Sequence, residues 1–265
     1  MKRLKILILA TGLVVPAAAF ADQIVTLKTR GDSTQSYLLL ADTGVAPKAV
    51  AVMFPGGQGQ VRLPADISQL QLGARGNFLV RTREMFRDQE LVVAIIDAPS
   101  DRQQAGMDDG FRAGREHSDD VAAAVKDLRG RFPSAKVFLV GTSRGTLSAA
   151  HAGRALSSAV DGVVLTSTVL FSGRRGMSLS GFDFGAIKAP LLFVHHAQDA
   201  CRVCPYSAAE NLGRTYPLIT VRGGKPAESE ECEPLSAHGY YGKEAETVGA
   251  IKNWILGRPF PKTVE

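Results

Sequence analysis

Long apolar segments are scarce in this 265-residue sequence. The one strongly hydrophobic stretch, residues 6–15, is too short for a transmembrane helix, which needs about 20 apolar residues. Internal repeats, low-complexity tracts and linkers between domains are absent as well. These absences exclude a repeat array and a string of tethered domains, and they indicate one large domain.

Charge of one sign is not in large excess either. The sequence has 31 Lys and Arg residues against 26 Asp and Glu, and three of the basic residues (Lys2, Arg3 and Lys5) precede the apolar stretch. Without those three, the formal charge falls from +5 to +2. The composition therefore gives no argument for a nucleic-acid partner.

The first 21 residues have the features of a signal peptide. A basic start leads into the short apolar stretch, and Ala19-Phe20-Ala21 matches the A-x-A cleavage pattern. We therefore expect a periplasmic or secreted protein that is cleaved after Ala21, with one domain over residues 22–265 and no membrane span once the leader is removed. The sequence leaves the oligomeric state open.

Short β-like runs alternate with helical patterns along the rest of the chain. Several runs are continuously apolar, which is typical of strands covered on both faces. The pattern predicts an α/β fold with a mostly parallel eight-stranded sheet and helices on both faces. Residues 97–117 and about 169–188 show neither pattern and are expected to border a binding cleft. The expected strands are 24–28, 36–40, 49–54, 91–96, 136–140, 162–166, 191–195 and 218–221, and the expected helices are 78–88, 119–131, 144–156, 208–214 and 244–256.

A candidate nucleophile lies between an expected strand and an expected helix. Gly141-Thr142-Ser143-Arg144-Gly145 fits the G-x-S-x-G pattern, in which a strained turn exposes the serine and the glycines allow close packing. The apolar strand before it and the Ala-rich helix after it are the setting that this pattern requires. Ser143 is therefore the predicted nucleophile.

A serine hydroxyl needs a base, and the base needs a third group that orients it. His238 is the only one of the five histidines that lies late enough in the chain to follow both an acid at a strand end and a further strand. Asp199 follows the expected strand 191–195, at the edge where open α/β sheets collect their chemistry. Asp183, after the strand before it, is the competing acid.

The remaining requirement is a pair of N–H groups that can bind an oxyanion. The backbone of Arg144, directly after the nucleophile, would supply one, and the glycine-rich segment Pro55-Gly56-Gly57-Gln58-Gly59 after the third strand would supply the other. Gly57 is the first choice in that segment and Gln58 the second. The Arg144 side chain would either contact an anionic substrate or form an ordinary solvated ion pair.

Together these residues resemble the α/β-hydrolase superfamily over nearly all of the chain after the leader. The match rests on the Pro55–Gly59 segment, the Gly141–Gly145 turn, Asp199 and His238, in that order. More narrowly, the chain is similar to small exported members of the esterase and dienelactone-hydrolase kind that have no large cap domain. The oxyanion segment departs from the common pattern because it begins with Pro55 rather than histidine.

Cysteine is rare, with only Cys201, Cys204 and Cys232. In an oxidising compartment two of them would pair. We expect the Cys201–Cys232 disulfide, which would tie the Asp199 loop to the His238 loop, because Pro205 directs Cys204 into a helix start. A Cys201–Cys204 ring remains the alternative. A metal cluster that includes His195 and His196 is a weaker interpretation, because the ligands do not form a known pair of spaced motifs. A redox role for Cys201-x-x-Cys204 is weaker as well, because the N-terminal βαβ setting of such motifs is missing.

The sequence thus predicts a serine hydrolase that cleaves a small-molecule ester through an acyl-enzyme, with no cofactor and no metal. A peptidase or amidase using the same three residues is the first alternative. A non-catalytic exported binding protein on the same fold is the second, because a fold does not determine a chemistry.

Overall fold

The computed structural model describes residues 22–42, 46–173 and 176–265, so the expected signal peptide lies outside the described residues. The described residues form one nine-stranded sheet in the order β1-β2-β4-β3-β5-β6-β7-β8-β9. The strands are β1 (Gln23–Lys28), β2 (Thr34–Leu40), β3 (Ala49–Phe54), β4 (Leu91–Ile96), β5 (Lys136–Thr142), β6 (Gly162–Thr166), β7 (Leu191–His196), β8 (Leu218–Val221) and β9 (Thr263–Val264). The first two pairings, β1 with β2 and β2 with β4, are antiparallel, and all the others are parallel.

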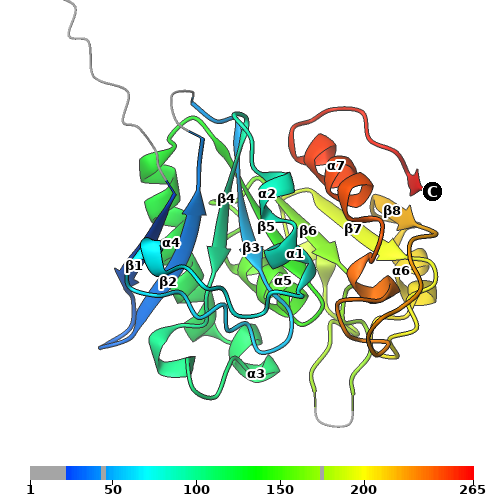
Figure 1. Ribbon diagram of the computed structural model, residues 1–265, viewed down its shortest axis with the longest axis horizontal. Helices are drawn as coiled ribbons and strands as arrows, with labels where there is room; N and C mark the ends of the chain where they lie inside the picture. Colours follow the sequence, from blue (N-terminus) through cyan, green and yellow to red (C-terminus); the bar gives the residue numbers. More distant parts are fainter. Residues whose placement is uncertain (1–21, 43–45, 174–175) are drawn as a thin grey trace, which may run out of the picture.

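Helices cover both faces of the sheet, as Figure 1 shows. Side chains that alternate along β3 point to opposite faces: Val50 and Val52 pack with α4 and α5, whereas Ala51 and Met53 pack with α1, α2 and α7. This two-sided burial explains why the central strands are uniformly apolar. The helices are α1 (Phe78–Arg81), α2 (Arg83–Phe86), α3 (Asp109–Ala113), α4 (Arg115–Arg131), α5 (Gly145–Ala155), α6 (Tyr206–Leu212) and α7 (Glu244–Ile255).

The expected α/β architecture is confirmed, but three local expectations are wrong. The sheet has a ninth strand, β9, which has only two residues at an edge and so leaves no hydrophobic run in the sequence. The expected helix 78–88 is two short helices that meet at Thr82, whose hydroxyl donates to the Phe78 carbonyl. The expected loop 97–117 contains α3, which Asp108 caps through the Phe111 N–H, and α4 begins at Arg115 rather than 119.

No large cap covers the carboxyl edge of the sheet in the described part of the chain. The described residues between β6 and β7 include the 3₁₀ helix η3 (Phe184–Ala186) but no inserted helical domain. Among the described helices, none has the length and hydropathy of a membrane span.

Candidate active site

Ser143 lies on the tight turn between β5 and α5, with a left-handed φ of 51°. Its own N–H donates to the Thr166 carbonyl at 3.0 Å, and its carbonyl accepts from the Thr146 N–H at 2.8 Å. Few non-glycine residues adopt such a φ, and those that do cluster at functional sites. The backbone is thus held in the strained turn that the sequence pattern predicts.

Close packing around the turn explains why the pattern requires glycine at these positions. A Cβ on Gly145 would collide with the Phe54 carbonyl of β3, and a Cβ on Gly141 would lie 2.5 Å from the Gly145 carbonyl oxygen. A Cβ on Gly56 would lie 2.9 Å from the Ser143 Cβ. Only glycine therefore lets the turn, α5 and the Pro55–Gly59 segment approach each other this closely.

His238 and Asp199 form a buried hydrogen-bonded pair. The Nδ1 of His238 lies 2.9 Å from Oδ2 of Asp199, and Oδ1 of Asp199 accepts the Cys201 N–H at 2.9 Å. The Nε2 of His238 makes no hydrogen bond within the described residues, and His238 lines the same cleft as Ser143. An imidazole bonded in this way through Nδ1 presents Nε2 as the free basic nitrogen. Asp183, the competing acid, is exposed at the start of η3, and the described contacts do not bring it to His238.

Two residues that the sequence analysis missed hold the histidine loop. The Ser167 hydroxyl donates to the His238 carbonyl at 2.7 Å. The buried Tyr240 hydroxyl lies 3.0 Å from the Ser167 hydroxyl and donates to the Val194 carbonyl at 2.7 Å. Burial raises the pKa of Tyr240 well above its ordinary value, so its hydroxyl remains a donor. No sequence motif signals these bonds, because they join residues that are 46 to 73 positions apart.

The Pro55–Gly59 segment presents free N–H groups beside Ser143. It turns through Gly57 and Gly59, which have φ values of 58° and 72°, and the Gly59 N–H closes the turn on the Gly56 carbonyl at 3.1 Å. Within the described residues, the N–H groups of Gly57, Gln58 and Arg144 have no hydrogen-bond partner. All three residues line the cleft together with Ser143 and are available to a ligand.

The Arg144 side chain forms an ion pair rather than a free anion-binding group. Its Nε lies 2.6 Å from Oδ1 of Asp109, and Oδ2 of the same carboxylate accepts the Met177 N–H at 3.1 Å. The ordinary ion pair considered from the sequence is therefore the one present.

The cleft has a volume of about 600 Å³. Its charged residues are Arg62, Arg75, Arg144 and Glu233. Neither Arg62 nor Arg75 forms an ion pair with a described residue. The lining residues are Gly56–Gln60, Arg62, Gly73–Phe78, Thr142–Arg144, Cys201, Val203, Cys232–Pro234, His238 and Gly239.

Arg62 stands at the rim of this cleft on a strained backbone. Its φ is 57°, and the buried Asp97 carboxylate accepts its N–H and those of Val61 and Leu63 at 2.7–3.1 Å. Arg62 is exposed, but its backbone is held in place by these hydrogen bonds. No motif in the sequence marks this residue.

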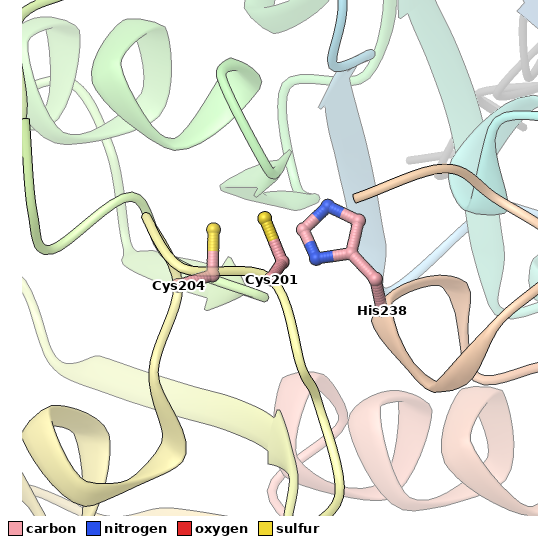
Figure 2. Close-up of side chains that lie close together, drawn as sticks. All are labelled: Cys201, Cys204 and His238. Atoms are coloured by element: carbon pink, nitrogen blue, oxygen red, sulfur yellow. The ribbon is translucent and has the colours of Figure 1, made fainter. Parts of the chain in front are cut away.

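The cysteines are paired as the sequence predicts. Cys201 and Cys232 form a disulfide, and Cys204 is a buried free thiol. Figure 2 shows Cys201 and Cys204 beside the His238 ring, and one ligand-type atom from each of the three lies within 4.8 Å of the others. The Cys201 sulfur is bonded to Cys232, so only Cys204 and His238 of the three remain as ligands, and two ligands do not make up a zinc site.

The hydrogen bonds and burial in this region also oppose a metal site with His195 and His196 and a redox role for Cys201-x-x-Cys204. His195 accepts the Thr168 N–H at 2.9 Å, the His196 Nε2 lies 2.9 Å from the Gly223 carbonyl, and neither histidine belongs to the group of close ligand atoms formed by Cys201, Cys204 and His238. Burial raises the pKa of the Cys204 thiol well above its ordinary value, which opposes a reactive dithiol at Cys201-x-x-Cys204.

Solved structures with this fold were found, whereas no protein-family profile and no curated protein sequence matches the chain. The chain is similar to an α/β serine hydrolase without a lid from Xanthomonas campestris, with a TM-score of 0.61 and 18% identity over 93% of this chain and 98% of that one. It is also similar to Est1E from Butyrivibrio proteoclasticus (TM-score 0.60, 13% identity, 88% and 98% covered). A third is a cold-adapted esterase from an Arctic intertidal metagenomic library (0.60, 13%, 89% and 93%).

These similarities, with the strand order and the parallel pairings, define the class. The chain has the α/β-hydrolase fold, and the similar solved structures include an α/β serine hydrolase and a cold-adapted esterase.

Proposed function

We propose that this protein is a serine hydrolase that cleaves carboxylic esters of small molecules. The observation that carries the proposal is that Ser143, on its strained turn, and His238, which is bonded to the buried Asp199, line the same cleft. The similarity of the fold to that of a cold-adapted esterase supports it further. An ester is favoured over an amide because alkoxide leaving groups demand less of a small open site than amines do.

The proposed mechanism is acyl transfer through an acyl-enzyme. Nε2 of His238 takes the Ser143 proton as Oγ attacks the ester carbonyl, and Asp199 stabilises the imidazolium through Nδ1. The developing oxyanion is bound by the N–H of Arg144 together with that of Gly57 or Gln58. His238 then protonates the leaving alcohol, and water repeats the sequence on the acyl group. The hydrogen bond from Ser143 to His238 would form as the substrate closes the cleft.

The charges of the cleft favour a substrate that carries an anionic group. Arg62 and Arg75 are cations without an ion-pair partner among the described residues, and Glu233 is the one carboxylate in the lining. A carboxylate on the acyl or alcohol part of the ester would gain a charge-assisted hydrogen bond at this rim.

Export through a signal peptide cleaved after Ala21 is part of the same proposal. A disulfide such as Cys201–Cys232 persists in oxidising compartments, which is consistent with the periplasm or the exterior of the cell.

The test is active-site labelling combined with one substitution. The protein without its leader should react with a fluorophosphonate probe and hydrolyse short nitrophenyl esters faster than aminoacyl nitroanilides. Ser143→Ala should remain folded, lose the label and lose several orders of magnitude in kcat. Hydrolysis by Ser143→Ala at the wild-type rate would overturn the assignment of the nucleophile. A stable, folded wild-type protein that takes no label would instead support a non-catalytic binding protein.

A further inference from the structure

Arg112 of α3 is an arginine buried entirely beneath the Pro55–Gly59 segment. Its Nη2 donates to the Pro55 carbonyl at 3.3 Å and to the Gly57 carbonyl at 3.2 Å, and its Nη1 donates to the Ser148 hydroxyl of α5 at 2.8 Å. Within the described residues no carboxylate forms an ion pair with it, and its Nε has no partner. A fully buried arginine is rare and is normally paired with an acid, so this site needs an explanation.

The surrounding structure makes room for this cation. A Cβ on Gly59 would lie 2.3 Å from the Met107 Cε and 2.6 Å from the Arg112 Nη2, so a larger residue at this position would crowd the guanidinium. Burial, followed by the charge of Arg144, lowers the pKa of Arg112 to about 9, which leaves it protonated at neutral pH. A positive charge is therefore held against the back of the segment whose front faces the cleft.

We propose that Arg112 is a positioning residue that orients and polarises the oxyanion-binding segment; the inference rests on the proposed function. The Gly57 carbonyl and the Gln58 N–H belong to one peptide group. A charged donor on that carbonyl draws electron density from the peptide and makes the Gln58 N–H a stronger donor. The same guanidinium fixes the turn by holding two of its carbonyls. Arg112 acts through the segment and does not touch the substrate.

This role predicts an effect on the transition state rather than on substrate binding. Interactions that strengthen only as the oxyanion forms change kcat, whereas KM for an uncharged ester stays nearly constant. The affinity for a trifluoromethyl ketone, which forms a tetrahedral oxyanion adduct on the serine, should fall with kcat.

The experiment compares Arg112→Met with Arg115→Met, a matched control at an arginine that is 92% exposed in its side chain at the start of α4. Arg112→Met should lower kcat by about 10²-fold, the cost of one weakened oxyanion donor, with KM within about 2-fold. Ketone affinity should fall in parallel, and Arg115→Met should behave as wild type. Millimolar guanidinium should partly restore kcat in Arg112→Ala.

Two outcomes would overturn the proposal. One is a folded Arg112→Met enzyme with wild-type kcat and wild-type ketone affinity. The other is a loss that appears only in KM. If Arg112→Met does not fold, Arg112→Lys provides the test. The proposal predicts that this variant loses about 10-fold in kcat at constant KM, and an unchanged kcat would contradict the proposal. Activity that survives Ser143→Ala would instead refute the proposed function, so the two failures are distinguishable.

Discussion

The disulfide between Cys201 and Cys232 joins the loop that carries Asp199 to the loop that carries His238. Cys201 also donates its N–H to the Asp199 carboxylate, so one residue holds both the acid and the bridge. The bond closes a sequence separation of 31 residues across the cleft that both cysteines line. It therefore constrains the distance between the two groups that the proposed proton transfer needs at a fixed separation.

Removing this bridge should lower both stability and activity. The double variant Cys201→Ser/Cys232→Ser should lose about 2–4 kcal/mol of unfolding free energy, because a loop of about 31 residues is no longer closed in the unfolded chain. Its kcat should fall as well, since the His238 loop gains freedom. Urea unfolding and ester kinetics measure both. Cys204→Ser, which leaves the bridge intact, is the matched control, and equal behaviour of the two variants would show that the bridge has no such role.

The sequence offers two candidate acids, Asp199 and Asp183, and a substitution at each position distinguishes them. Asp199→Asn should lower kcat by about 10³–10⁴-fold, because the amide no longer favours the Nδ1–H tautomer of His238. Asp183→Asn should change kcat by less than about 2-fold, since Asp183 is exposed at the start of η3. Ester kinetics at saturating substrate provide the measurement. The reverse pattern would move the acid to the earlier strand.

Arg62 should determine the preference for substrate charge. For an ester that carries a carboxylate, Arg62→Gln should raise KM by about 10-fold, which corresponds to one charge-assisted hydrogen bond of about 1.4 kcal/mol. For a neutral ester of the same length, KM should stay within about 2-fold. The wild-type preference should weaken at high salt, because the rim is exposed. Equal effects on the KM of both esters would mean that Arg62 does not distinguish charged from neutral substrates.

The strained turn at Ser143 and the hydrogen-bonded pair of His238 and Asp199 could be predicted from the sequence, because each follows from a simple requirement of the fold. The turn at Ser143 needs glycine at positions 141 and 145 for steric reasons, and such a requirement leaves a pattern that can be read without the fold. The chain order of Ser143, Asp199 and His238 follows from the order of the parallel strands. The bridge between Cys201 and Cys232 followed from the position of Pro205 and from those same loops.

The residues that support the site could not be predicted because their bonds span distant parts of the chain. Ser167 meets Tyr240 across 73 positions, and no periodicity links them. Arg112 lies in a charge-rich stretch where an exposed and a buried arginine look alike in the sequence. The five-residue helix α3 and the two-residue strand β9 are too short for a hydrophobic period to show.

His117 and His195 are buried neutral histidines that the proposed mechanism does not use. His117 packs against the rings of Phe54 and Phe111, and neither of its nitrogens has a hydrogen-bond partner among the described residues. Burial lowers the pKa of His117 to about 3 and that of His195 to about 4. In the unfolded chain both would titrate near the ordinary value of about 6.5.

Acid should therefore destabilise the protein through these two histidines. Between pH 6.5 and about 4 the unfolded chain binds protons that the folded protein excludes. The contribution of these histidines to the free energy of unfolding is therefore fully present above pH 6.5 and is lost as the pH falls below it. The loss at pH 4.5 should be about 2–3 kcal/mol for each histidine, measured by urea unfolding at several pH values. His117→Phe, which keeps a ring between Phe54 and Phe111, should make the pH dependence shallower over this range. His151→Gln, at a partly exposed histidine, is the control and should change it less. A slope that His117→Phe leaves unaltered would assign the acid sensitivity to other groups.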